Sequence, residues 1–395
     1  MSKYPYTMTR TPSTLTPGGQ MRVRYHASFA TNTGYSQAAT DNAMALLKAG
    51  VDLDLKHLPD GQQEGLQKRY AKLLDVYEKK PYDWPTHVIV HTTPRPAPTY
   101  IAEHPPGVKK ICYTAWETDK LPSKDADALN QSFDLIIVPS QFCHDSFMAG
   151  GVDTEKLRVL PHCFDPNWWW DQTQTRDGVC YGIPKDPDPN GPYTFYNVGP
   201  WNIRKNQVGL LTAYWTEFYR EENVRLRLVC GVTQNVMREL ELLKKVLNLP
   251  HYAPVEFIDS EGGWAAAEDY RSIHYTSHCY ATCTRGEGFG LGSFEAAIVG
   301  NPVIVPDWSG HLDYLDDYEG SRLFDGNMTP CAQIRLGIDG TQYWFEPDLE
   351  GFQDCLRNAF EVRLERSFRS NHHEIEANYG YKSIGAWFKK LLEEV

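Results

Sequence analysis

Short apolar runs alternate with amphipathic stretches along most of this chain, and that alternation restricts its fold more than any other feature. The runs that predict β-strands before position 165 lie at 22–27, 51–58, 87–91, 109–115, 134–140 and 156–162. Helices are predicted between several of them, at 36–50 and 140–151. Strand–helix alternation of this kind indicates an α/β fold with a parallel sheet covered on both faces.

The alternation stops over residues 166–192 and then resumes. Strands are predicted at 194–199, 225–231, 255–259, 279–284 and 302–306, with helices at 206–221, 236–248 and 381–395. Two doubly wound α/β units in tandem form a cleft between the carboxyl ends of their two sheets. Open α/β sheets bind ligands at that edge, so we expect the functional site there.

The length of 395 residues agrees with two domains. We predict a flexible N-terminal arm, an N-terminal Rossmann-like domain, a linker or insertion, a C-terminal Rossmann-like domain, and a last helix that crosses back to the first domain. Their expected bounds are 1–20, 21–165, 166–192, 193–378 and 379–395. The linker is rich in Pro, Gly, Asp and Asn and begins with the run Trp168–Trp170. Packing at the domain junction is favoured for these tryptophans over a ligand platform.

Composition excludes several classes of protein. The net charge of −12 argues against broad, non-specific nucleic-acid binding, although a local basic groove stays compatible with it. Nine scattered cysteines without a CxxC pair indicate reduced thiols and no zinc site. No apolar run reaches the length of a membrane-spanning helix, and the N-terminus lacks the apolar core of a signal peptide. We therefore expect a cytoplasmic protein without a membrane span.

The most informative segment follows the predicted strand at 279–284. Glu287 stands in a loop before alternating glycines, and Glu295 falls on the first turn of the predicted helix that follows. The glycines permit close approach of a ligand, and the helix start offers N–H groups to phosphate. A carboxylate accepts two hydroxyl hydrogen bonds, which suits the diols of a sugar or ribose. In the alternative, Glu295 only complements the helix dipole and Glu287 is solvated.

A basic pair, Arg204 and Lys205, follows the first predicted strand of the second domain, in the segment NVGPWNIRKN. Two fixed cations stabilise negative charge on a group beside them, as a metal ion does. The alternative is a solvated basic turn.

Residues 287–304, EGFGLGSFEAAIVGNPVI, resemble the E-x7-E signature of retaining GT-B glycosyltransferases, most closely glycosyltransferase family 4. That signature typically reads E-G-F-G-L-x-x-x-E-A-x-x-x-G-x-P-V-I, and this chain matches it at every fixed position. The resemblance implies a GT-B fold, with two Rossmann-like doubly wound domains that face each other across a cleft. It covers residues 194–315 well and 21–165 weakly, and it implies that 21–165 form the acceptor domain and 193–378 the nucleotide-sugar domain.

The resemblance also implies roles for the residues of the signature. Glu295 would bind the ribose hydroxyls of a nucleotide-sugar, and Glu287 would hold the hydroxyls of the donor sugar. The loop that begins at Gly288 would hold the sugar and the diphosphate. Its contacts would be the backbone amides of Phe289, Gly290 and Leu291.

Outside the signature, Lys205 matches the lysine of the family. The usual arginine position holds Pro200, so Arg204 is expected to take its place. Gly34 and Gly199 would be points of close approach to the donor, and backbone near Ile258 would contact the nucleobase.

The first domain offers weaker candidates for the acceptor: Tyr35, His91, Trp116 and Glu117. Family members often carry a histidine near the strand end at 113–119, where this chain has Trp116-Glu117. Glu117 either positions an acceptor hydroxyl or only caps a helix, and a lone histidine such as His91 is more often structural than catalytic.

The resemblance thus implies a retaining glycosyltransferase that binds a nucleotide-diphosphate sugar and needs neither a metal ion nor another cofactor. Glu287, Lys205 and Arg204 are its expected catalytic residues, and the leaving diphosphate is its expected base. Two acceptors stay open: a glycan or lipid-linked saccharide, or a 5-hydroxymethylpyrimidine in phage-type DNA. The alternatives of another class are a non-catalytic nucleotide-sugar-binding protein and a GT-B epimerase.

Overall fold

A computed structural model gives the fold of the chain. It describes residues 21–29, 33–58, 85–102, 104, 106–170, 175–176, 179–180, 187–260, 267–316, 318–331, 340–365 and 372–395. The predicted arm, residues 1–20, lies outside the described residues, as do positions 171–174, 177–178 and 181–186 of the predicted linker.

The first half of the chain forms a six-stranded sheet in which every strand pair is parallel, in the order β2-β1-β3-β4-β5-β6. All six strands expected from the sequence are present: β1 (Arg22–Ala27), β2 (Asp52–His57), β3 (His87–His91), β4 (Lys109–Tyr113), β5 (Leu135–Val138) and β6 (Leu157–Val159). Their apolar side chains are almost wholly buried because helices cover both faces of the sheet.

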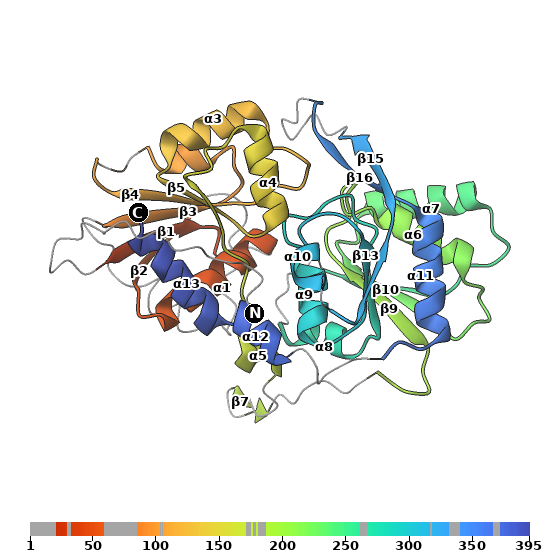
Figure 1. The fold of residues 1–395 in the computed structure, drawn as a ribbon. Helices are drawn as coiled ribbons and strands as arrows, with labels where there is room; N and C mark the ends of the chain where they lie inside the picture. Colours follow the sequence, from red (N-terminus) through yellow and green to blue (C-terminus); the bar gives the residue numbers. More distant parts are fainter. Residues whose placement is uncertain are drawn as a thin grey trace.

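Helices lie on both faces of this sheet (Figure 1). One apolar core, on one face, includes side chains of α1 and α13, and a second core, on the other face, includes side chains of α3 and α4. The elements are α1 (Gly34–Lys48), the 3-10 helix η2 (Ala97–Tyr100), α3 (Ser123–Ser132), α4 (Gln141–Gly150), α12 (His372–Tyr379) and α13 (Tyr381–Glu393). We call this sheet with its helices the first lobe.

The second half repeats the architecture with a parallel sheet in the order β11-β10-β9-β12-β13-β14. Its strands are β9 (Tyr193–Val198), β10 (Val224–Cys230), β11 (Val255–Asp259), β12 (Cys279–Ala281), β13 (Val303–Pro306) and β14 (Ser321–Phe324). Five of them follow the sequence prediction. The edge strand β14 escaped it because only one of its four residues is buried, which leaves no apolar pattern.

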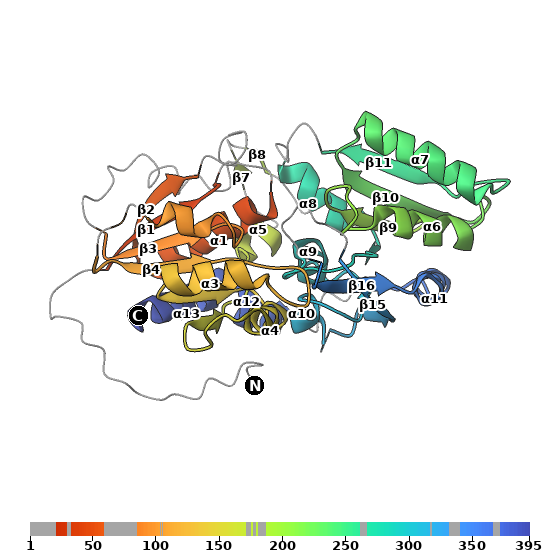
Figure 2. The same ribbon diagram turned by 90° about the horizontal axis from the view of Figure 1, so that it is seen from above.

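Helices cover this second sheet on both faces as well (Figure 2). They are α6 (Gln207–Glu217), α7 (Gln234–Leu247), α8 (Ala267–Tyr275), α9 (Leu291–Ile298), α10 (Leu312–Leu315) and α11 (Leu349–Glu361). Two antiparallel pairs complete the described elements: β15 (Gly326–Pro330) with β16 (Tyr343–Pro347), and β7 (Thr175–Arg176) with β8 (Val179–Cys180). We call the second sheet with α6 to α11 the second lobe.

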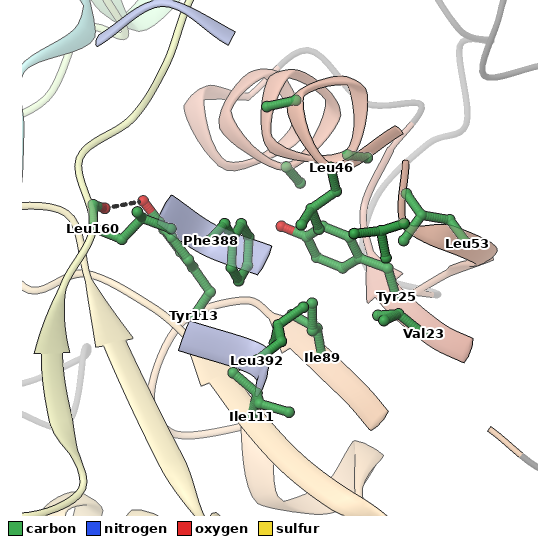
Figure 3. Packing of buried hydrophobic residues seen from close by; sticks show 14 of the residues in the cluster. Val23, Tyr25, Leu46, Leu53, Ile89, Ile111, Tyr113, Leu160, Phe388 and Leu392 are labelled. Atoms are coloured by element: carbon green, nitrogen blue, oxygen red, sulfur yellow. Dashed lines mark hydrogen bonds between the residues drawn. The ribbon is translucent and has the colours of Figure 1, made fainter. Parts of the chain in front are cut away.

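The last helix, α13, belongs to the core of the first lobe although the second lobe precedes it in the chain. Phe388 and Leu392 lie among side chains of β1, β3 and β4 (Figure 3). The backbone carbonyl of Leu392 accepts a hydrogen bond from His87 Nε2 at 3.0 Å, and the Tyr381 hydroxyl donates to Asp41. These contacts tie the end of the chain to the first lobe.

The tryptophan run Trp168–Trp170, in the short helix α5 (Pro166–Trp170), packs where the two lobes meet. Trp169 is 2% exposed, and Trp170 Nε1 donates to the carbonyl of Ile298 at 2.9 Å. Trp168 differs from its neighbours because it lines the large cavity between the lobes.

No helix within the described residues is both long enough and apolar enough to cross a membrane.

Candidate functional site

A cavity of about 620 Å³ lies between the lobes, at the carboxyl ends of both sheets. The first lobe lines it with residues that follow β1, β3, β4 and β6, and the second lobe with residues that follow β9, β10, β11 and β12. Parallel strands bring such loops to one edge although the residues are far apart in sequence.

The second lobe contributes a cluster of charges. β9 and β12 are neighbours in the sheet, so the loop after β9, which carries Arg204 and Lys205, meets the loop after β12, which carries Glu287. Lys205 Nζ lies 2.7 Å from Glu287 Oε1, and Arg204 Nη1 lies 3.0 Å from Glu287 Oε2. Thr284 Oγ1 donates a third bond to the same carboxylate at 2.9 Å.

Both loops are fixed by backbone contacts. The carbonyl of Arg204 accepts a hydrogen bond from the amide of Arg285 at 2.7 Å. The amide of Glu287 donates to Ser309 Oγ at 3.1 Å, and its carbonyl accepts from Gly310 N at 2.9 Å. The charged side chains are therefore held in place without a ligand.

The pKa values in this cluster follow from burial and from the neighbouring charges. Burial alone would raise the pKa of Glu287, but Lys205 and Arg204 outweigh it and lower that pKa to about 2. Burial lowers the pKa of Lys205, an effect that Glu287 opposes. Burial also acts to lower the pKa of Arg204, but the charges of Glu117 and Glu287 outweigh burial, so this pKa is raised above its ordinary value. At neutral pH the carboxylate of Glu287 and the guanidinium of Arg204 are therefore both charged.

Backbone N–H groups at the start of α9 face the same cavity. Phe289, Gly290 and Leu291 all line it, and their N–H groups have no hydrogen-bond acceptor among the residues that the structure describes. Gly290 has φ +84°, and a Cβ there would come within 2.9 Å of Ser293 Oγ, so the turn requires glycine. Unpaired N–H groups at a helix start are suited to bind an anion.

Glu295 does not take part in the charge cluster. It lies in the second turn of α9, one turn further along than the sequence predicts, and is 1% exposed. Gln37 Nε2 donates to its Oε1 at 2.5 Å, and the Tyr270 hydroxyl donates to its Oε2. Gln37 and Tyr270 line the cavity whereas Glu295 does not, so the two side chains separate this carboxylate from the cavity.

The wall of the first lobe is formed largely by neutral groups. His91 ends β3, Tyr113 ends β4, and His162 follows β6; all three line the cavity. Tyr113 stacks against His162 with ring centroids 5.7 Å apart, and the ring centroids of His91 and Tyr113 are 4.3 Å apart. Burial lowers the pKa of His162 to about 3 and that of His91 well below its ordinary value, so both imidazoles are neutral at pH 7.

Of the predicted acceptor residues, Tyr35, His91 and Glu117 line the cavity and Trp116 does not. Trp116 Nε1 donates to Thr118 Oγ1 at 2.7 Å and to the carbonyl of Lys120 at 3.0 Å, so its indole N–H is already bonded. The Tyr35 hydroxyl donates to the carbonyl of Ala115 and accepts from its amide, both at 3.1 Å. Its ring, and not its hydroxyl, is therefore presented to the cavity.

Glu117 lies next to the charge cluster of the second lobe. Its Oε1 is 3.6 Å from Arg204 Nη2. Its backbone carbonyl presses on Gly286, where a Cβ would come within 2.2 Å of it. Only glycine lets the two lobes approach so closely at this point.

The remaining predicted positions lie at other parts of the cavity. Gly34, at the start of α1, and Gly199, after β9, both line it, and Gly288 lines it beside Glu287. Ile258 is in β11 and does not line the cavity, whereas Ser260, two residues further along, does.

Several cavity residues were not predicted from the sequence. His162 lines the cavity, and Thr284, which does not line it, donates to Glu287; neither was assigned to the site from the sequence. Gln37 and Tyr270 were not recognised as partners of Glu295. Trp201 lines the cavity beside Gly199. In the sequence, only its position in the loop that carries Arg204 and Lys205 indicated a place in the cavity. Within the described ranges, no group of three or more His, Cys, Asp or Glu side chains is placed to hold a metal ion.

Comparison with known sequences gives no match: no family model and no curated protein matches the chain. Solved structures do resemble it. HepE (Alr3699) from Anabaena, in complex with UDP-glucose, has a TM-score of 0.63 at 14% identity, covering 95% of this chain and 100% of that one. A glycosyltransferase from Rickettsia africae ESF-5 has a TM-score of 0.65 at 12% identity, with 95% and 98% covered.

Sucrose-phosphate synthase from Thermosynechococcus elongatus has a TM-score of 0.64 at 13% identity, with 95% of this chain and 98% of that one covered. These matches and the two parallel six-stranded sheets confirm the predicted GT-B fold. Identities this low demonstrate a common fold only, so the chemistry of this chain has to be argued from its own residues.

Proposed function

We propose that this chain is a retaining glycosyltransferase that moves a sugar from a nucleoside-diphosphate sugar to an acceptor hydroxyl. The observation that carries the proposal is the geometry of Glu287, which is fixed between Lys205 and Arg204 beside the unpaired N–H groups of α9. The likeness in fold to HepE, whose structures contain UDP or UDP-glucose, supports the same class of donor.

The cations and the α9 amides would hold the diphosphate. An ammonium has three donors and a guanidinium five, so Lys205 and Arg204 keep donors available after binding Glu287. Fixed cations and N–H groups stabilise the negative charge that grows on the diphosphate as the glycosidic bond breaks. Because they are already in position, little reorganisation is needed when the donor reacts.

Glu287 would hold the donor sugar. Its pKa of about 2 keeps the carboxylate ionised at neutral pH, so it accepts hydrogen bonds from sugar hydroxyls and does not act as an acid. It also partly balances the two cations, which limits the electrostatic cost of burying them before a diphosphate arrives.

In the proposed reaction the acceptor oxygen attacks the anomeric carbon from the face that the diphosphate leaves. The new C–O bond forms as the bond to the diphosphate breaks, and the acceptor proton passes to a phosphate oxygen. Glu287 and Glu117, the carboxylates of the cavity wall, both lie within 3.6 Å of Arg204. Since both are paired with a cation, neither suits the role of an attacking nucleophile.

The acceptor would enter along the first lobe, past Tyr35, His91 and Glu117. Both a saccharide and a 5-hydroxymethylpyrimidine flipped out of DNA carry a suitable hydroxyl. The acceptor test therefore compares a saccharide panel with a hydroxymethylated duplex under the same conditions.

The function is tested in two stages. A thermal-shift screen against nucleoside-diphosphate sugars, starting with UDP-glucose, selects the donor, and release of nucleoside diphosphate is then measured with each acceptor. We expect one donor to raise the melting temperature and one acceptor class to accelerate release, and NMR of the product to show retained anomeric configuration.

The other outcomes separate the alternatives. Donor binding without transfer or hydrolysis would favour a nucleotide-sugar-binding protein, and conversion of one donor sugar into its epimer would favour an epimerase. An inverted anomeric centre would contradict the retaining mechanism alone, whereas absence of donor binding would contradict the whole proposal.

A further inference from the structure

Resting on the proposed function, we infer that His162 binds the transferred sugar, and that its Nε2 atom accepts a hydrogen bond from one sugar hydroxyl. Sequence reasoning did not assign this residue to the site. The inference follows from the hydrogen bonds behind the imidazole, which leave only one tautomer.

The tautomer follows from the Tyr113 hydroxyl. This hydroxyl has one hydrogen, and it donates that hydrogen to the carbonyl of Leu160 at 2.7 Å, the contact drawn as a dashed line in Figure 3. A carbonyl only accepts, so the direction of this bond is fixed. The same hydroxyl lies 3.0 Å from His162 Nδ1 and must accept there. Nδ1 therefore carries the hydrogen.

In a neutral imidazole the second nitrogen then has a free lone pair. His162 is neutral because it is 7% exposed and burial strongly disfavours its charged form. The residue lines the cavity, and the one hydrogen bond of its ring to another described residue is made by Nδ1, so Nε2 has no partner among them. A hydrogen-bond acceptor is thus left open in the cavity wall.

The position of the ring indicates which ligand it meets. The His162 ring packs edge-on against Phe289, with centroids 4.9 Å apart. Phe289 belongs to the loop that joins Glu287 to the free amides of α9, where the proposed donor sugar and diphosphate lie. A diphosphate carries no hydrogen for a bare lone pair, but a sugar hydroxyl does. The acceptor at Nε2 therefore matches the sugar and not the phosphates.

His162 would orient the sugar and would not remove a proton. A nitrogen that is protonated only near pH 3 is a weak base at neutral pH, yet it still accepts a hydrogen bond. Together with Glu287, it would grip the sugar from both lobes: a charged acceptor on one side and a neutral acceptor on the other.

The first test reads the tautomer directly. Imidazole nitrogen-15 spectra of the wild-type protein distinguish protonated from unprotonated ring nitrogens, and the signal missing from His162→Gln assigns the residue. We expect an unprotonated Nε2 and a protonated Nδ1 at neutral pH. A hydrogen on Nε2 would overturn the inference, whatever the variants do in kinetic assays.

The second test couples the residue to one hydroxyl. Wild type and His162→Phe are assayed with the selected donor and with its deoxy analogues, one hydroxyl removed at a time. Phe keeps a ring but removes the acceptor, so we expect kcat/KM to fall about three- to tenfold. One deoxy donor should lose a similar factor with wild type and almost nothing with His162→Phe. His162→Gln, which retains an acceptor oxygen, should recover part of the loss.

His251→Phe serves as the matched control because His251 is exposed and does not line the cavity. If every deoxy donor loses the same factor in wild type and in His162→Phe, the assignment of His162 is wrong while the proposed function stands. If wild type binds no nucleotide-sugar, the proposed function fails first and the inference with it.

Discussion

The two walls of the cavity present side chains of different chemistry. The second lobe presents Arg204 and Lys205, both of which pair directly with Glu287. Among the described residues that line the cavity from the first lobe, Glu117 alone carries a full charge, and the rest are neutral hydroxyl, amide, imidazole and apolar groups. One wall therefore presents mainly charged groups and the other mainly neutral ones, and we call them the charged wall and the neutral wall.

This difference matches the two parts of the proposed donor. A diphosphate is multiply charged and needs cations and N–H groups, whereas a sugar and an acceptor alcohol need neutral donors and acceptors. Variants in the two walls should therefore fail in different ways: the charged wall through nucleotide affinity and turnover, the neutral wall through sugar orientation.

The largest effect is expected from Glu287→Gln. The amide keeps the shape of the side chain but removes the counter-charge beside Lys205, leaves Arg204 paired with Glu117, and offers the sugar a weaker acceptor. Turnover should fall about 100-fold, the loss typical of removing one preorganised electrostatic contact. Steady-state assays on protein whose circular dichroism matches wild type measure this.

Glu346→Gln is the matched control, since Glu346 also pairs with an arginine, Arg285, but does not line the cavity. It should retain wild-type turnover. Equal losses in the two variants would mean that the charged wall has no special part in the reaction.

Lys205→Met is expected to act on nucleotide binding. The apolar side chain keeps most of the packing but removes one of the two cations, so affinity for the nucleoside diphosphate should fall about tenfold, or about 1.4 kcal/mol. Titration calorimetry gives the value, and Lys244→Met, on the outer helix α7, provides the control. Unchanged affinity in Lys205→Met would remove this lysine from the diphosphate site.

The two walls should lose stability over different pH ranges. The folded-state pKa of His162 is about 3, below its unfolded value near 6.5, so the unfolded chain binds a proton first as the pH falls. The stability that neutral His162 contributes is thus present above about pH 6.5 and is lost below it, at up to about 1.4 kcal/mol per pH unit. For Glu287 the same sign applies, but the loss runs from about pH 4.3 down to about pH 2.

Urea unfolding from pH 7 to pH 3 should therefore give a flatter profile between pH 6.5 and 5 in His162→Gln, and a flatter profile only below about pH 4.3 in Glu287→Gln. Buried His91 shares the direction of His162 and should keep part of the slope. Parallel profiles for wild type and His162→Gln above pH 5 would contradict a buried neutral imidazole.

The smallest effect is expected from Tyr35→Phe. Its hydroxyl is bonded to the backbone of Ala115 in both directions, so its loss should lower the free energy of unfolding by about 1 kcal/mol. Turnover should stay within about threefold of wild type, because the ring that lines the cavity is kept. A tenfold loss of turnover at unchanged stability would show that the hydroxyl contacts substrate.

The contrast between the walls also explains what sequence reasoning could predict. The charged wall depends on residue types that few others replace, at fixed spacing from glycines, so Glu287 and the pair Arg204-Lys205 stood out. In the neutral wall a histidine, tyrosine or amide can each supply an acceptor. His162 was therefore not assigned to the site from the sequence, and only the Tyr113 hydroxyl beside its Nδ1 gives it a defined tautomer.

The fold was predictable where strands are buried on both faces, as in β3 and β5, because the centres of these strands are continuous apolar runs. Prediction failed at the exposed edge strand β14 and for the β15–β16 hairpin, where burial is partial. Glu295 illustrates a further limit. Its residue type and spacing were visible, but the partners that separate it from the cavity, Gln37 and Tyr270, come from distant parts of the chain.

The central claim is that Lys205, Arg204 and the start of α9 hold the diphosphate of an activated sugar. A crystal structure of the chain with the nucleotide-sugar that the thermal-shift screen selects tests it most directly. We expect both phosphates within hydrogen-bond distance of Lys205, Arg204 and the amides of Phe289 to Leu291, and Glu287 within hydrogen-bond distance of the sugar. Phosphates bound elsewhere, with these groups still paired only to one another, would contradict it.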